Sequence, residues 1–213
     1  MTSSNRSLTG LIISHRKWWE YLCNTVFAIL SAVFMLAMLV DFMTNHRLSS
    51  LLICVFEGAM VWFAATRPLP KETNLSLYDW IISPIGAYLP LFLRPVGEPH
   101  DSIFLLAAQL IGQFTYVAAL FSLNKSFGVV AANRGVKTGG MYRVMRHPFY
   151  AGLIVSNAAY VLQNMSVTNS AIFVTFVVLS IMRLVEEERL LRKDPDYAEY
   201  ATRTRWRLLP FVY

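Results

Sequence analysis

Long apolar runs alternate with short polar segments along most of this chain. A helix that crosses a bilayer needs about 20 mostly apolar residues, and several runs approach this length. They are Leu22–Met43, Leu48–Ala65, Tyr78–Leu93, Ile103–Leu123, Pro148–Leu162 and Asn169–Leu184. This pattern predicts an all-α fold, a polytopic bundle of five to six transmembrane helices.

Two of these runs depart from a simple span. Tyr78–Leu93 contains Pro84, Gly86 and Pro90, which favours a kinked or re-entrant segment, because broken helices are tolerated where protein covers the freed backbone. Pro148–Leu162 is about 22 Å long at 1.5 Å per residue, which is short for a membrane. Together with the last run it predicts a tight helical hairpin.

Composition supports a membrane protein. The chain is 55% hydrophobic and 15% charged, whereas a soluble domain has about 25% charged residues. The net charge of +6 would suit a nucleic-acid partner, but the basic residues lie between apolar runs, where the positive-inside rule accounts for them. We therefore expect membrane lipids, and no nucleic acid, as partners.

The distribution of Lys and Arg predicts the orientation. With a cytoplasmic N-terminus and six crossings, all of the 19 Lys and Arg residues except Arg47 and Arg94 fall on the cytoplasmic side. The N-terminal stretch lacks a signal-peptide pattern, so we expect the first apolar run to be retained. The predicted protein is integral and multi-pass, with both termini cytoplasmic. Its cysteines and histidines show no metal-ligand spacing, so no metal is expected.

The segment GVKTGGMYRVMRHPFYAG, residues 135–152, is the first candidate for chemistry. Its glycines permit a close approach of the backbone to a ligand. Pro148 is expected to begin a helix, and a helix N-terminus attracts a carboxylate or phosphate. Tyr142 and Tyr150 offer aromatic faces for an adenine ring or a cation.

A structural interpretation of the same segment stays open. Arg143 and Arg146 would then only hold lipid phosphates. Gly152 and Ser156, four residues apart, would form a contact between closely packed helices.

The sequence RLVEEE at the end of the last apolar run is the second candidate. Arg183 and Glu187 are four residues apart and share one helix face. An ionisable pair near the membrane boundary is costly, which indicates function; the alternative is a structural ion pair. Glu188 and Arg192 are interpreted as a solvated pair.

The C-terminal tail predicts a further short helix. Asp194 is suited to cap it and Pro195 to begin it. Tyr197, Tyr200 and Ala201 would then share one stripe of this helix.

The strings TGGMYRVMRHPFYAG, RLVEEE, DYAEY and LLPF, in this order, resemble the isoprenylcysteine carboxyl methyltransferase family. They are also similar to the related phospholipid N-methyltransferases. The resemblance covers roughly residues 123–213. Met141 and Phe149 depart from the family's usual residues without removing a polar group.

The resemblance implies a cytoplasmic C-terminal site for S-adenosylmethionine. It implies that Glu187 completes this site and that Arg183 faces the reacting group of the substrate, which makes these two the expected catalytic residues. The residues expected to contact the cofactor are Val136, Lys137, Tyr142, His147, Pro148, Phe149, Tyr150 and Glu187. Residues 1–123 would be N-terminal transmembrane helices, and 124–213 the methyltransferase-like catalytic region.

The predicted function is S-adenosylmethionine-dependent methylation of a lipophilic acceptor, an isoprenylcysteine-like carboxylate or another lipid, as a small molecule or a lipidated substrate. Arg183 would hold a carboxylate through two parallel hydrogen bonds. Two alternatives remain: a membrane lipid or sterol-type reductase that uses NADPH, because such reductases carry a motif similar to RHPFY, and a non-catalytic membrane scaffold.

Overall fold

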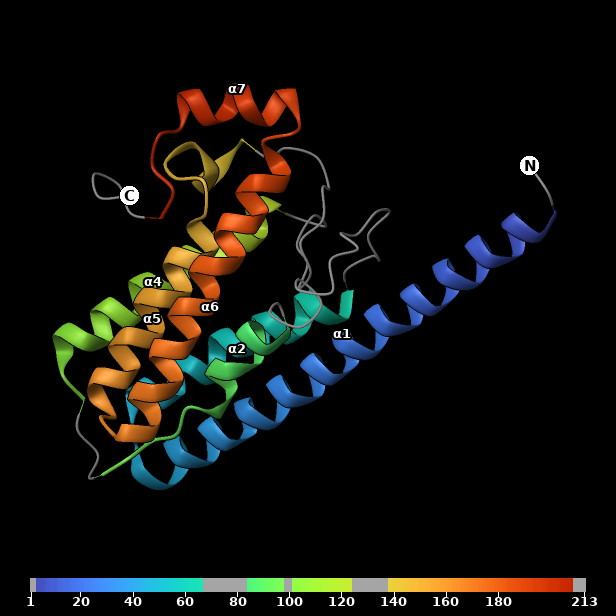
Figure 1. The fold of residues 1–213 in the computed structure, drawn as a ribbon. Coiled ribbons are helices and arrows are strands. Elements are labelled where there is room, and N and C mark those ends of the chain that lie inside the picture. The colour runs from blue at the N-terminus through green and yellow to red at the C-terminus, as the bar shows by residue number, and fades with distance from the viewer. Residues whose placement is uncertain (1–2, 67–83, 98–100, 124–137, 209–213) are drawn as a thin grey trace.

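The computed structural model describes residues 3–66, 84–97, 101–123 and 138–208, and within them it contains helices and no strand. The all-α prediction is therefore confirmed for these residues (Figure 1). The helices are α1 (Ser3–Asn45), α2 (Leu48–Thr66), α4 (Ile103–Leu123), α5 (Pro148–Gln163), α6 (Val167–Leu191) and α7 (Pro195–Arg203), with short 3₁₀ turns η1 (Leu89–Phe92) and η3 (Gly140–Arg143).

Three described segments are long and apolar enough to cross a membrane: Thr25–Asn45 of α1, Ile103–Leu123 and Val167–Leu191. The apolar helix Leu48–Trp62 is shorter, and α5 has only 16 residues. An integral membrane protein is thus supported. Five to six crossings and the side on which the termini lie stay predictions.

Helices α4 and α5 pack backbone against backbone. A Cβ atom added to Gly112 would lie 2.5 Å from the Ser156 nitrogen, and one added to Gly152 would lie 2.5 Å from the Tyr116 nitrogen. Only glycine permits so close an approach. The predicted small-residue contact of Gly152 and Ser156 is therefore confirmed. It places the start of α5 firmly against α4.

The predicted irregular segment has short helical turns where it is described. Residues 84–88 are helical and lead into η1, whereas residues 78–83 lie outside the described residues. Tyr88 stacks on Phe27 of α1, with ring centroids 5.7 Å apart. The segment also contacts α6, because a Cβ on Gly86 would lie 3.5 Å from the Arg183 Cδ atom. It therefore lies between α1 and α6.

A buried polar network closes the end of the bundle where α1 meets α2. Arg47 is only 5% exposed; its Nη1 lies 3.8 Å from Asp41 Oδ1 and donates to Asn164 Oδ1 at 3.4 Å. Ser50 donates to the other Asp41 oxygen at 2.6 Å. Arg47 therefore ties the α1–α2 turn to the hairpin of α5 and α6.

Candidate active site

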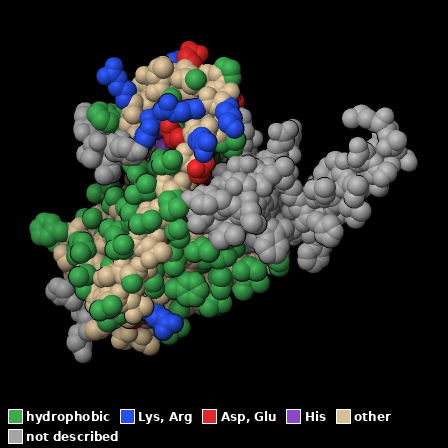
Figure 2. Space-filling view, in the orientation of Figure 1, with side chains coloured by type: hydrophobic (Ala, Val, Ile, Leu, Met, Phe, Trp, Pro, Cys, Tyr) green, Lys and Arg blue, Asp and Glu red, His purple; other side chains and the backbone are tan. Residues whose placement is uncertain are grey.

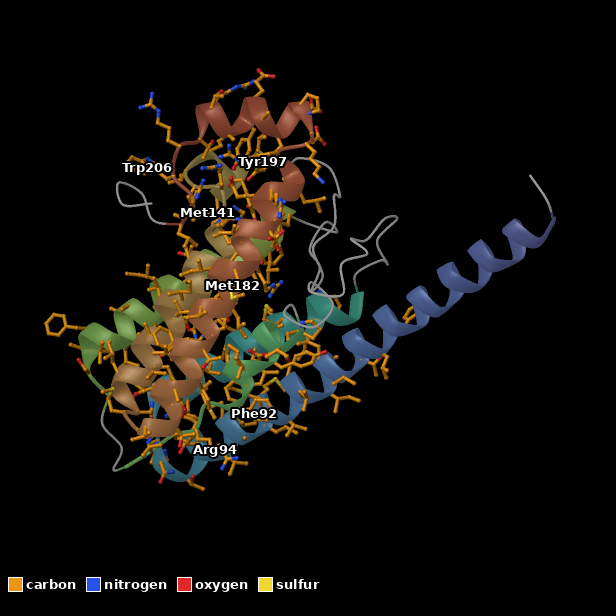
Figure 3. All side chains as sticks on the ribbon, in the orientation of Figure 1. Phe92, Arg94, Met141, Met182, Tyr197 and Trp206 are labelled. Atoms are coloured by element: carbon orange, nitrogen blue, oxygen red, sulfur yellow. The ribbon has the colours of Figure 1, made fainter. Side chains whose placement is uncertain are left out.

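Charged side chains gather at the opposite end of the bundle. Figure 2 shows acidic and basic groups clustered there, above a broad apolar surface. Figure 3 places Met141, Tyr197 and Trp206 at this end. Three elements meet there: the η3 loop with the start of α5, the last turns of α6, and α7 with the residues that follow it (Figure 1).

Glu188 of α6 is the centre of a buried polar cluster and is only 4% exposed. Its Oε2 accepts hydrogen bonds from Arg146 Nη1 at 2.7 Å and from Arg192 Nε at 3.2 Å. Its Oε1 lies 3.1 Å from His147 Nε2 and accepts from Tyr197 Oη at 2.8 Å. The prediction of a solvated pair was wrong for Glu188. Arg146 and His147, which directly precede α5, and Tyr197 of α7 cover its carboxylate.

The residues after α7 pair with the segment that leads into α5. The Arg146 amide donates to the Trp206 carbonyl at 2.9 Å, and the His147 amide donates to the Arg207 carbonyl at 2.8 Å. These two amides are thus unavailable to an anionic ligand. The Arg146 side chain is 5% exposed and is held by Glu188, so it does not reach lipid phosphates as the structural interpretation proposed. Arg143 is exposed.

Helix α7 forms as its sequence predicts. Asp194 caps it by accepting from the Asp196 amide at 3.0 Å, and Pro195 is its first residue. Tyr197 and Tyr200 are both buried on its inner stripe. Tyr200 Oη donates to the Tyr142 carbonyl at 2.6 Å, and burial raises the pKa of the Tyr200 hydroxyl to about 12. The helix is therefore docked onto the η3 loop.

Beside this cluster, Tyr150 joins the two residues that the sequence assigns to catalysis. Its hydroxyl donates to Glu187 Oε1 at 2.6 Å. The Arg183 Cζ atom lies 5.5 Å from the centre of the Tyr150 ring, a distance at which a cation is attracted to an aromatic face. Arg183, Glu187 and Tyr150 are thus together, and Glu187 and Arg183 are only partly buried.

Tyr142 belongs to the same neighbourhood. Burial and then the negative charge of Glu187 raise the pKa of its hydroxyl. Its loop requires glycine at residue 140, because Gly140 has a φ of +58° and a Cβ there would lie 2.4 Å from Ser122 Oγ. The glycine-rich sequence thus permits the close contact of this loop with α4.

The other expected cofactor residues are placed differently. The His147 ring faces Glu188, and Pro148 is the buried first residue of α5. Phe149 packs edge-on to Tyr116 of α4, with centroids 6.3 Å apart, and contacts the core. These three residues therefore support the site through packing and hydrogen bonding within the protein. Val136 and Lys137 lie outside the described residues.

Sequence reasoning missed Glu188, although its position carries a signal. Phe176, Ser180, Leu184 and Glu188 follow one another at intervals of four, and all four are buried. Residues four apart lie on one face of a helix. Glu188 thus continues the buried stripe of α6 beyond its apolar part, whereas Glu187 lies to one side of it.

Residues 102–194 match the family model of phospholipid methyltransferase. The match runs from just before α4 to Asp194, the residue that caps α7, and it contains η3, α5, α6 and the two acids Glu187 and Glu188. No curated protein matches the chain significantly. The resemblance found in the sequence is confirmed as a match over residues 102–194 to the phospholipid methyltransferase family, which includes the isoprenylcysteine carboxyl methyltransferases. This similarity indicates a membrane methyltransferase.

Proposed function

We propose that this protein transfers a methyl group from S-adenosylmethionine to a lipophilic acceptor at the cytoplasmic surface of the membrane. The observation that carries the proposal is the cluster of Tyr150, Glu187 and Arg183, which joins α5 to α6 within the family region. Both helices come from apolar segments, so the cluster is within reach of a lipid-borne substrate.

The residues present fit this cofactor. Glu187 uses one carboxylate oxygen to accept from Tyr150, and its Oε2 accepts no hydrogen bond from any described residue. That oxygen suits the ribose hydroxyls or the ammonium group of S-adenosylmethionine. Gly139 adds room, because a Cβ there would meet no atom within 4 Å.

Glu187, Tyr142 and Tyr150 would hold the cofactor, with Val136 and Lys137 as further proposed contacts. His147, Pro148 and Phe149 would keep this pocket in shape. When bound, S-adenosylmethionine supplies an activated methyl group on a sulfonium. The protein has then to hold an acceptor atom about 3 Å from that methyl carbon and to exclude water.

Arg183 is the residue that we assign to the acceptor. The Tyr150 ring keeps its guanidinium in place, and a guanidinium binds a carboxylate through two parallel hydrogen bonds. A carboxylate acceptor needs no base, because it is already deprotonated at neutral pH. The cluster therefore favours an isoprenylcysteine-like carboxylate on a small molecule or lipidated protein, with another lipid as the second acceptor class.

Binding to the purified protein tests the proposal. S-adenosylmethionine and NADPH are titrated separately by calorimetry, and binding of S-adenosylmethionine alone is expected. Binding of NADPH alone would favour a lipid reductase, and binding of neither would favour a scaffold; both results overturn the proposal.

The acceptor is found by mass spectrometry of membrane lipids. Cells with and without the gene are fed methyl-labelled methionine, and a labelled lipid or lipidated peptide is expected only with the gene. An identical set of labelled products in both strains would contradict the proposed acceptor class.

A further inference from the structure

An open groove of about 450 Å³ lies along α1, at the end of the bundle away from the candidate active site. Figure 3 shows Phe92 and Arg94 beside α1 at this end, far from Tyr197 and Trp206. We name it the α1 groove. It is lined by Leu30, Val33, Phe34, Ala37 and Met38 of α1 and by residues 91–95.

The α1 groove is apolar along its length. Its α1 residues follow one another at intervals of three and four, so they form one face of the helix. From Leu30 to Met38 this face extends about 12 Å at 1.5 Å per residue. Val33 is 59% and Phe92 51% exposed, so the groove opens outward. Because it lies within the candidate span Thr25–Asn45, it opens toward lipid hydrocarbon.

Arg94 places a positive charge at one end of this apolar groove. Its backbone is fixed by Asn169, whose Oδ1 accepts from the Arg94 amide at 3.2 Å and whose Nδ2 donates to the Arg94 carbonyl at 2.8 Å. Its side chain is exposed. Figure 2 shows a basic group isolated at the edge of the apolar surface, where Figure 3 labels Arg94.

Arg47, the second basic residue at this end, is not an exposed positive charge like Arg94. Arg47 is 5% exposed, lies 3.8 Å from Asp41 and donates to the Gly97 carbonyl. Its charge is therefore balanced inside the protein. No acidic side chain of a described residue forms a salt bridge with Arg94. Arg94 is thus the exposed cation that the described residues offer to an external anion here.

We propose that the α1 groove binds one anionic phospholipid, with an acyl chain along Leu30–Met38 and the phosphate at Arg94. The apolar part fits the chain and the guanidinium fits the phosphate. The cation lies at the end of a span and the apolar face extends toward the bilayer centre. This order matches that of the headgroup and acyl chain of a phospholipid in one leaflet. This lipid would be a structural ligand, separate from the methyl acceptor, whose proposed site is at the other end of the bundle.

Lipid retention tests this proposal without any enzymatic assay. The full-length protein is reconstituted in nanodiscs of equal phosphatidylglycerol and phosphatidylcholine, transferred to mild detergent, and studied by native mass spectrometry. The wild type is expected to retain one phosphatidylglycerol. Arg94→Gln should retain about fivefold less, because one basic residue near an anionic surface contributes about 1 kcal/mol.

A second variant, Ala37→Trp, fills the groove and should abolish retention of either lipid. The matched controls are Arg203→Gln, an exposed arginine on α7, and Ala171→Trp, an exposed alanine on α6; both should retain lipid as the wild type does. Equal retention by Arg94→Gln and wild type would overturn the headgroup assignment. Unchanged lipid retention in Ala37→Trp would overturn the assignment of the α1 groove as the lipid site. The assignment would also be overturned if the wild type were a dimer that Ala37→Trp converts to a monomer, because a second copy would then occupy the groove.

Discussion

The ring of His147 lies 3.1 Å from the carboxylate of Glu188, and this contact joins residues 41 positions apart in the chain. The same carboxylate holds Arg146 and the Tyr197 hydroxyl. Three segments of the candidate active site therefore depend on one buried acid. Its neighbour Glu187 is directed instead to Tyr150. The two consecutive glutamates thus differ in role: Glu188 stabilises the fold, and Glu187 lies beside the proposed cofactor site.

Replacing Glu188 should destabilise this end of the protein. In Glu188→Ala the buried Arg146 guanidinium loses its counter-charge, and breaking a buried pair in this way costs about 3–5 kcal/mol. Thermal unfolding in detergent measures the loss. Glu186→Gln is the control, because Glu186 lies 3.8 Å from Arg189, which is 78% exposed at its side chain. Unfolding of Glu188→Ala at the wild-type temperature would show that the cluster is not structural.

The Glu187 and Arg183 variants should separate cofactor binding from turnover. Glu187→Ala is expected to abolish S-adenosylmethionine binding, whereas Arg183→Ala should bind it normally and lose turnover. Arg183→Lys keeps the charge without the planar fork, so we expect only partial recovery of activity with a carboxylate acceptor. Calorimetry and labelled methyl transfer measure the two effects. Normal binding and turnover in both alanine variants would show that the site is misplaced.

The Tyr150 hydroxyl should matter separately from its ring. Tyr150→Phe removes the 2.6 Å hydrogen bond to Glu187 and keeps the aromatic face beneath Arg183. A hydrogen bond to a charged group contributes about 1.5–3 kcal/mol, so we expect binding of S-adenosylmethionine to weaken by at least about tenfold. Tyr150→Leu should in addition lower turnover. If wild type and Tyr150→Phe bound S-adenosylmethionine with equal affinity, the Tyr150 hydroxyl would not be part of the cofactor site.

The contact between α4 and α5 should not tolerate a methyl group. In Gly152→Ala the new Cβ would lie 2.5 Å from the Tyr116 nitrogen, and the helices must separate. Overpacking of this kind costs about 1–3 kcal/mol, which thermal unfolding measures. Gly58→Ala is the matched helical control, since its Cβ would lie 3.7 Å from Met35 Sδ. A stable Gly152→Ala together with an unstable Gly58→Ala would contradict the packing described.

Alkaline pH should detach α7. Burial raises the pKa of Tyr200 from 10.0 to about 12, and the pKa of Tyr197 is also raised, first by burial. A group whose pKa is raised on folding contributes stability that is complete below its unfolded pKa and is lost as pH rises through its folded pKa. The docking of α7 should therefore weaken between pH 10 and about 12.

Tyrosinate absorbance and proteolysis of the tail follow this transition. Tyr200→Phe lacks one of the two titrating hydroxyls, so its tail should gain less protease sensitivity between pH 10 and about 12 than the wild-type tail does. Identical profiles for the two proteins would exclude Tyr200 as a cause.

Local sequence features were sufficient for much of the fold. Apolar runs predicted α1, α4 and the hairpin of α5 and α6, because a helix satisfies its own backbone and needs only a continuous apolar segment in lipid. Asp194 and Pro195 predicted the start of α7 for an equally local reason. The family resemblance rested on short strings and was confirmed over residues 102–194.

The spacing of four from Leu184 indicates that Glu188 continues the buried stripe of α6, but only the tertiary structure decided which side chains cover it. Glu187 and Glu188 are adjacent in the sequence and chemically identical, and the pattern RLVEEE does not state which side chains cover either of them. Packing against the approach to α5 and against α7 buries Glu188, whereas Glu187 is only partly buried. Arg146, which the alternative structural interpretation placed on lipid phosphates, is instead a partner of Glu188, and its burial depends on a segment about 60 residues away.

The sequence by itself predicted a helical membrane protein with a region that resembles a methyltransferase family, because hydrophobic length and short motifs are properties of contiguous residues. Only the tertiary structure decided which polar residues face one another. The burial of a charged side chain depends on the residues that pack over it. For Glu188 these residues come from the segment just before α5, from the end of α6 and from α7. The end of the bundle that carries the candidate active site is thus divided into a buried cluster around Glu188 and a more open cluster of Tyr150, Glu187 and Arg183.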